Sequence, residues 1–114
     1  MIKVFNKLEE IQKYYNKKSN TYVFKEKGEY IYLVVFEFNL DVEANIDALS
    51  INAWDIDALD IEASYILADN IRARNITYYG VCCAYNSIKC KSIEPAAVNA
   101  QHFVLTGDLE IEDE

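Results

Sequence analysis

The chain has 114 residues, of which 52% are hydrophobic, and a formal net charge of −8. This length and composition fit one globular domain with a core of its own. The longest apolar stretch, residues 30–36, is too short to span a bilayer, and the acidic balance disfavours nonspecific binding to nucleic acid. The first ten residues lack the apolar run of a signal peptide, so we expect a cytoplasmic protein whose three cysteines are free thiols.

Residues 1–45 are predicted to form an N-terminal cap made of an α-helix and a β-hairpin. Asn6 and Glu9 have the spacing of a capping box. Four apolar residues fall on one face of the predicted helix, namely Val4, Leu8, Ile11 and Tyr15. Runs of β-branched and aromatic residues at 21–24 and 30–40 flank a polar turn, which is the pattern of a hairpin.

A five-residue repeat begins at Ile46. Every fifth residue is Ile or Val, at positions 46, 51, 56, 61, 66, 71, 76 and 81. Ala stands two residues after each of the first six, at positions 48, 53, 58, 63, 68 and 73. A period of five fits neither a helix nor a plain strand, and it predicts a chain that turns after each short extended segment. We therefore expect a mainly β fold, a short β-solenoid with Ile and Ala facing inward.

Asp or Asn closes most of these units, and such residues suit corners because their side chains bond nearby backbone groups and they tolerate left-handed backbone angles. The repeat slips by two residues near 82–87 and resumes at Ile88, Ile93, Val98 and Phe103. Residues 46–107 then form either three coils of four units or four coils of three, a tube of about 15–20 Å. Residues 102–105 with Leu109 and Ile111 are predicted to cap its C-terminal end. Residues 108–114 are expected to be an acidic tail, and the whole chain one domain.

The repeat over residues 46–107 resembles that of the pentapeptide-repeat proteins, which form square right-handed β-helices. It differs in one respect, because the small residue lies two before the large one in that family and two after it here. The repeat sequence, Ile-[Asp/Asn]-Ala-[Leu/Trp]-[Asp/Asn], also looks like repeats in uncharacterised proteins of low-GC bacteria and their phages. Neither resemblance implies a catalytic residue or a cofactor.

The residues able to carry chemistry are few, and we expect no catalytic site, no cofactor and no metal. Cys82, Cys83 and Cys90 lack the paired spacing of a zinc site. In the predicted frame Cys83 and Cys90 take the buried third position, and Cys82 faces outward as the more reactive thiol. The single histidine, His102, could form a nucleophilic pair with Cys90, twelve residues earlier, but nothing in the sequence suggests an orienting third group or an oxyanion hole.

Acidic residues of the first coils are predicted to form a solvated face rather than a calcium site, because residues 29–79 contain no glycine. The fourth position of three consecutive units holds large apolar residues, Leu49, Trp54 and Leu59. Since this position should point away from the core, we expect them to form one interaction surface. It would be covered by the chain's own cap or by another chain.

These patterns favour a non-enzymatic structural or protein–protein interaction module whose partner is another protein or a second copy of itself. The alternative is an acidic DNA-mimic inhibitor of a DNA-binding enzyme. The pentapeptide-repeat resemblance suggests this alternative, and ten acidic residues without a basic one between 28 and 71 favour it. We expect no binding to nucleic acid or to membranes.

Overall fold

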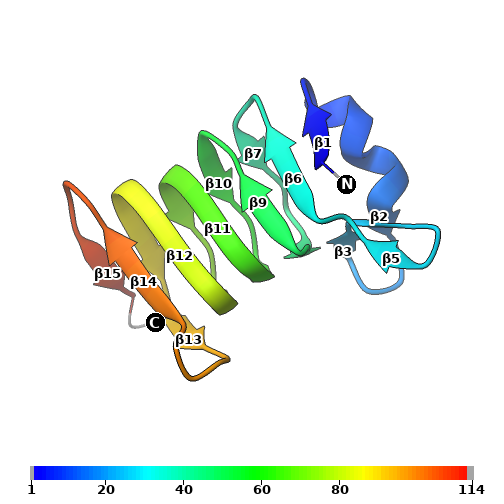
Figure 1. The fold of residues 1–114 in the computed structure, drawn as a ribbon. Coiled ribbons are helices and arrows are strands. Elements are labelled where there is room, and N and C mark those ends of the chain that lie inside the picture. The colour runs from blue at the N-terminus through cyan, green and yellow to red at the C-terminus, as the bar shows by residue number, and fades with distance from the viewer. Residues whose placement is uncertain (1, 113–114) are drawn as a thin grey trace.

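A computed structural model describes residues 2–112 as a mainly β protein, with 61% strand and 6% helix. Most of the chain forms a β-solenoid of about five turns (Figure 1), which confirms the predicted fold class. Among residues 2–112, no helix is long and apolar enough to cross a membrane.

Each coil passes through three faces, which we name by their outward side chains. The apolar face holds β1 (Ile2–Phe5), β6 (Leu33–Phe36), β9 (Ser50–Asn52), β14 (Gln101–Val104) and the middle parts of the long strands β11 (Asp60–Arg72) and β12 (Asn75–Cys90). The acidic face holds β3 (Thr21–Val23), β8 (Asn45–Asp47), β13 (Ser92–Pro95) and the first parts of β11 and β12. The mixed-charge face holds β7 (Leu40–Asp41), β10 (Asp55–Asp57), β15 (Leu109–Ile111) and the last parts of β11 and β12.

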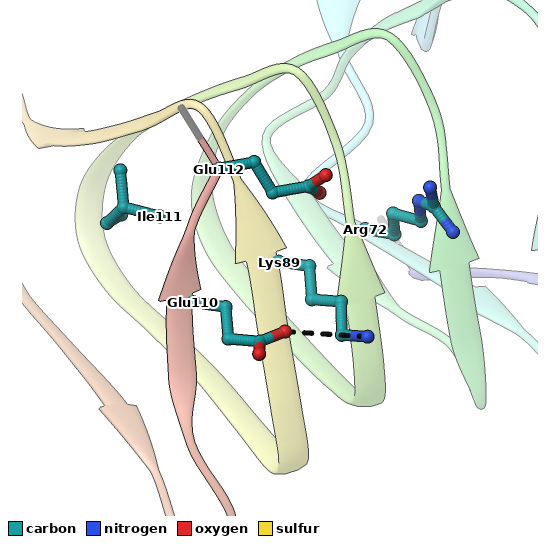
Figure 2. A pocket seen from close by; sticks show the side chains of 5 residues that line it. All are labelled: Arg72, Lys89, Glu110, Ile111 and Glu112. Carbon is teal, nitrogen blue, oxygen red and sulfur yellow. Dashed lines mark ion pairs between the residues drawn. The ribbon is translucent and has the colours of Figure 1, made fainter. Parts of the chain in front are cut away.

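Strand register shows that one coil contains three units. Ile46 pairs with Ile61, and Ile61 pairs with Ile76, in parallel strands fifteen residues apart. The solenoid is therefore three-sided and not square, which resolves the choice between three and four units per coil. Figure 2 shows the mixed-charge face, where Lys89 and Glu110 stand on neighbouring strands and form an ion pair of 3.4 Å between Nζ and Oε2.

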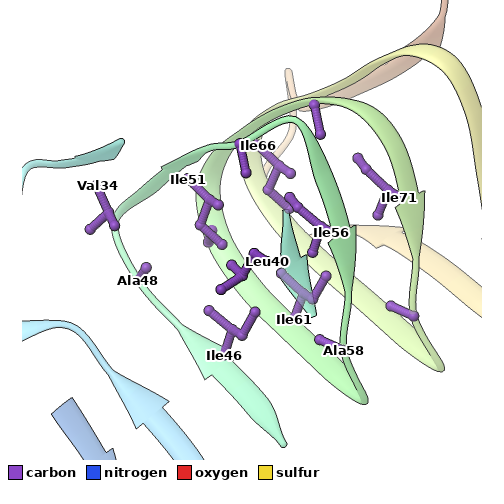
Figure 3. Close-up of a cluster of buried hydrophobic side chains, with 14 of the residues drawn as sticks. Val34, Leu40, Ile46, Ala48, Ile51, Ile56, Ala58, Ile61, Ile66 and Ile71 are labelled. Atoms are coloured by element: carbon purple, nitrogen blue, oxygen red, sulfur yellow. The ribbon is translucent and has the colours of Figure 1, made fainter. Parts of the chain in front are cut away.

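Isoleucine fills the core as predicted. Ile51, Ile56 and Ile61 come from the three different faces and point toward the axis of the coil (Figure 3), and each is 1% exposed. The six Ala residues of the repeat are also buried. Because each Ala precedes a corner, its short side chain leaves room for the backbone of the next face. The inward positions therefore fix the coil, whatever the outward positions carry.

The slip in the repeat lies earlier than the sequence suggested. One residue is added between Tyr78 and Val81, and a second after Ala84. Cys82, not Val81, consequently takes the inward position opposite Ile66, while Val81 faces outward. A side chain at residue 80 would meet the Tyr65 ring at 2.7 Å, so Gly80 is what lets the extra residue pass beneath that ring.

After residue 95 the predicted five-residue frame no longer applies. Val98 lies in the loop between β13 and β14 and is 99% exposed, and Phe103 faces outward. His102 and Val104 take the inward positions, in register with Cys82 and Ala84. The prediction of Val98 and Phe103 as core residues is wrong, because loop residues were added between the last strands and shifted the frame.

Corner residues stabilise the stack through side-chain ladders. At one corner the Asn75 amide donates to Asp60 Oδ1 at 3.0 Å, and the Ser92 hydroxyl donates to Asn75 Oδ1 at 2.7 Å. Among residues 2–112, the non-glycine residues with positive φ are Asn20 and Lys27, and neither lies in the repeat. Asp and Asn at the corners thus form hydrogen bonds between coils, and Asn45 accepts one from the backbone N–H of Asp60, as the prediction of side-chain bonding expects. The predicted left-handed backbone angles do not occur there.

The N-terminal cap is built differently from the prediction. Its helix, η1 (Leu8–Tyr14), is a 3-10 helix, and the Asn6 N–H donates to Glu10 at 2.7 Å instead of to Glu9. In a 3-10 helix every third residue shares a face, so Ile11 and Tyr14 are buried. Val4 and Tyr15, expected on that face, lie exposed in β1 and β2 (Tyr15–Asn16).

The predicted hairpin is short. It comprises β4 (Lys25–Glu26) and β5 (Glu29–Tyr30), joined by Lys27 and Gly28 with φ of 53° and 84°. These positive angles are those of a tight two-residue hairpin turn. The flanking strands β3 and β6 leave the hairpin and join two different faces of the solenoid.

Within residues 2–112, no strand or helix covers the C-terminal coil. Residues predicted to cap it form the last coil itself, since β14 and β15 both pair in parallel with β12. Leu109 and Ile111 are in register with the buried Ile88 and Cys90, yet they remain 37% and 50% exposed. β15 falls inside the segment expected to be a tail, whose last residues, 113–114, lie outside the described part of the chain.

Candidate interaction face

The three faces differ sharply in their outward side chains. We compare the outward residue that directly follows the large inward residue on each strand. On the acidic face these outward residues are Asp47, Glu62, Thr77 and Glu94. The mixed-charge face presents Asp57, Arg72, Lys89 and Glu110 at the same position. The apolar face presents Asn52, Leu67, Cys83 and Phe103. At this position, charge is thus confined to two of the three faces.

The apolar face runs the whole length of the solenoid. Six of its large apolar side chains are between 38% and 63% exposed, namely Ile2, Val4, Tyr65, Leu67, Val81 and Phe103. None of the outward side chains of its strands is charged. In Figure 1 the strands β1, β6, β9 and β14 lie toward the viewer along this face. An uncharged and mostly apolar surface of this kind is typical of a contact site.

The apolar face has relief near its middle. On β9 the outward residues are Ser50, which is 7% exposed, and the half-buried Asn52. On the next strand, Tyr65 and Leu67 stand directly beside them in register and are 55% and 49% exposed. The small, little-exposed polar side chains at β9 therefore stand lower than the large, exposed ones at β11, and we refer to these two strands of the face as the recess and the ridge.

The structure does not bring the predicted surface residues together. Leu49, Trp54 and Leu59 occupy three successive corners of one coil, because a coil has three units and residues five apart lie on different corners. Leu49 and Leu59 are half-buried, and Trp54 is exposed. The expected single row does not exist, although Trp54 borders the apolar face.

Cys82 and Cys83 exchange their predicted positions, since Cys82 is buried and Cys83 faces outward. Cys82 and Cys90 are fully buried, and burial raises the pKa of the Cys82 thiol to about 12. Cys83 is half-buried and faces outward on the apolar face. The prediction of Cys82 as the reactive thiol is wrong because the slip begins before it, whereas burial of Cys90 is confirmed.

His102 lies over Cys82, and not beside Cys90. The buried Tyr78 hydroxyl is 2.6 Å from His102 Nδ1. Burial disfavours the thiolate form of Cys82, and the thiolate is the nucleophilic form of cysteine, so we interpret this cluster as core packing. Within residues 2–112, no group of three His, Cys, Asp or Glu side chains is placed to hold a metal ion.

A shallow pocket of about 160 Å³ lies at the corner between the acidic and apolar faces. The Tyr30 hydroxyl donates to Asp47 at 3.1 Å, and the Tyr79 hydroxyl donates to Glu62 at 3.0 Å. Burial, together with the nearby Glu62, raises the pKa of Asp47. Both carboxylates thus accept hydrogen bonds from tyrosines. We interpret this pocket as part of the polar border of the apolar face.

The apolar face was missed because its signal appears only when every third unit is compared. Read consecutively, the outward residues Asp47, Asn52 and Asp57 look alike. Comparison of the chain with protein-family models, with curated proteins and with solved structures finds no match. The β-solenoid is therefore established by the strand register alone.

Proposed function

We propose that the protein is a non-enzymatic interaction module whose apolar face binds a protein partner, either another protein or a second copy of itself. One observation carries this proposal: the outward residues on two faces are mostly charged or polar, whereas those on the third are uncharged and mostly apolar along its whole length. A rigid parallel sheet offers such a surface without ordering flexible loops, which lowers the entropic cost of binding. The buried thiols and tyrosine-bonded carboxylates support a non-enzymatic role.

We class the repeat of this module as similar to a pentapeptide repeat, with three units in each coil. Its free thiols support a cytoplasmic location. We infer a bacterial or phage origin from the resemblance of the repeat sequence to repeats of such proteins.

A site-specific photo-crosslinker tests the binding surface. It replaces Leu67 on the apolar face in one variant and Arg72 on the mixed-charge face in the other, and both positions lie on β11. In the native host, we expect a discrete protein adduct from position 67 and none from position 72. Equal adducts from both positions, or none from position 67, would contradict the proposal.

A DNA-mimic inhibitor is the second candidate. The molecule is 36 Å long, about the length of ten base pairs at 3.4 Å each. The carboxylates form no continuous row, however, because Thr77 interrupts the acidic face and Arg72 and Lys89 interrupt the mixed-charge face. Protection of a DNA-binding enzyme from its DNA, lost on changing Asp47 and Glu62 to Asn and Gln, would favour this candidate.

A further inference from the structure

We propose that the occupant of the apolar face is a second copy of this chain, bound face to face about a two-fold axis parallel to the strands. The two solenoids then run antiparallel. This inference rests on the proposed function and names the partner. It follows from the shape of the face, from the distribution of charge between the two ends, and from the area available.

The relief of the face is complementary to itself in this arrangement. From one end to the other, the strands of the face are β1, β6, β9, β11, β12 and β14, so the centre lies between β9 and β11. Antiparallel pairing places β9 of one copy opposite β11 of the other. The ridge of Tyr65 and Leu67 then enters the recess at Ser50 and Asn52, twice per dimer.

The alternative two-fold axis, along the solenoid, places each strand opposite itself. The ridge at β11 would then meet its own copy, and the recess at β9 would stay empty. Packing of apolar surfaces loses contacts wherever such gaps remain. Shape therefore favours the antiparallel pair.

Charge distribution favours the same arrangement. Residues 2–20 carry five Lys and two Glu, whereas residues 91–112 carry one Lys and four acidic residues. Antiparallel pairing brings the basic end of one copy beside the acidic end of the other. Lys7, after β1, and Asp108, after β14, are both exposed and lie at the same corner of opposite ends, so they approach each other across the dimer.

The area is sufficient for a reversible dimer. The six exposed apolar side chains of the face present on the order of 600 Å² per copy, against about 800 Å² per partner in a standard interface. Because the face itself is uncharged, its burial leaves no carboxylate or ammonium group without water.

Sedimentation of the purified protein at roughly 1–100 μM measures the dimer. Leu67→Glu and Arg72→Glu form a matched pair, since each places a carboxylate at the same position of one coil, on different faces. We expect dimers of the wild type and of Arg72→Glu. We expect Leu67→Glu to raise the dissociation constant at least about thirtyfold, as loss of a central contact does. Circular dichroism establishes that all three are folded.

Charge reversal tests the orientation. Lys7→Glu should weaken the dimer, and Lys7→Glu combined with Asp108→Lys should restore it, because both charges of each contact are then exchanged. Carbodiimide treatment of mixed ¹⁴N/¹⁵N dimers should join Lys7 of one isotope to Asp108 of the other. A double variant that stays weak, together with the absence of this crosslink, would overturn the antiparallel arrangement.

The outcomes separate the two proposals. A monomeric wild type, or a Leu67→Glu protein that dimerises like the wild type, overturns self-pairing. If the crosslinker at position 67 nevertheless captures a different protein, the interaction function stands and only the identity of the partner is wrong. If position 67 captures neither a second copy nor another protein, both proposals fail.

Discussion

The solenoid core is filled regularly by the coils of residues 45–76 and irregularly by those of residues 77–111. In the first group every inward large residue is Ile, each except Ile76 has Ala two residues later, and neighbouring coils are offset by fifteen residues. In the second group the offset grows to seventeen within β12 and reaches twenty-one at β15. Extra residues are placed in outward bulges and loops, while the inward register continues.

Core volume is compensated where the repeat is irregular. Cys82 takes a position that Ile holds in the preceding coils, and Tyr78 takes a position that Ala holds. The loss of volume at one inward site is thus near a gain at another, as close packing requires. Inward positions of this solenoid thus stay buried in the later coils even where the residue type changes.

The largest expected effect separates the two groups of coils. Ile56→Ala should lower the free energy of unfolding by about 2–5 kcal/mol, because it leaves a cavity between rigid neighbouring coils. Cys82→Ala should cost only about 1 kcal/mol, since less volume is removed. Urea melts measure both, with Asp57→Ala as an exposed control that should change little. Equal losses from Ile56→Ala and Cys82→Ala would contradict the comparison.

Gly107→Ala tests the later coils alone. A side chain at this corner would collide with the backbone oxygen of Asn86, so we expect a loss of about 1–3 kcal/mol, as overpacking produces. Hydrogen exchange should show β14 and β15 losing protection while residues 45–76 keep theirs. Gly28→Ala serves as the control, because nothing lies within 4 Å of the added group and only its φ of 84° is unfavourable. Uniform loss of protection would show instead that the two groups unfold as one unit.

Tyr78→Phe removes the hydroxyl that bonds His102 and keeps the ring that fills the core. We expect a loss of about 0.5–1.5 kcal/mol, the net contribution of one hydrogen bond. Tyr85→Phe, on the same strand but with an exposed ring, should change stability little. A larger loss from Tyr85→Phe than from Tyr78→Phe would mean that the later coils are not held by this contact.

The smallest effects concern the thiols. Cys83 should react with a thiol reagent in the folded protein, whereas Cys82 and Cys90 should react only on unfolding, because both are buried. Mass mapping of the labelled peptide measures this. Early labelling of Cys82 would place the slip where the sequence alone suggested it.

The same burial predicts a dependence of stability on pH. The pKa of the Cys82 thiol is raised to about 12 in the fold, so its contribution to stability is full below about pH 8.5 and declines as the pH rises toward 12. Urea midpoints at pH 8 and pH 10 should fall for the wild type and fall less for Cys82→Ala. Equal declines would show that other groups, such as Cys90, dominate this range.

The repeat predicted the inward columns because burial at Ile46, Ile51 and Ile56 is a one-dimensional property of a five-residue unit. The number of units per coil depends on how the third unit meets the first, a long-range contact that no local pattern encodes. The interaction surface depended on that number. Once Leu49, Trp54 and Leu59 are distributed over three corners, the row inferred from them disappears.

The later coils were misread for a different reason. At residues 78–83 three apolar or aromatic side chains adjoin two cysteines, so each of two neighbouring frames places suitable residues inward. The observed frame places Gly80 close to the Tyr65 ring, a contact between different coils that no local sequence pattern predicts. The 3-10 helix was likewise selected by packing of Ile11 and Tyr14 over the open N-terminal end, and not by helix propensity.

Three units per coil also set how the chain can lengthen. A duplicated segment of fifteen residues would add one strand to every face and leave each face with its own chemistry. A duplicated five-residue unit would conserve the repeat and the Ile core, yet it would rotate all later residues by one face. Leu67 would then follow a strand of acidic residues, and the apolar surface would be divided between two sides. Selection for the surface would therefore accept gains and losses of whole turns and reject those of single repeats.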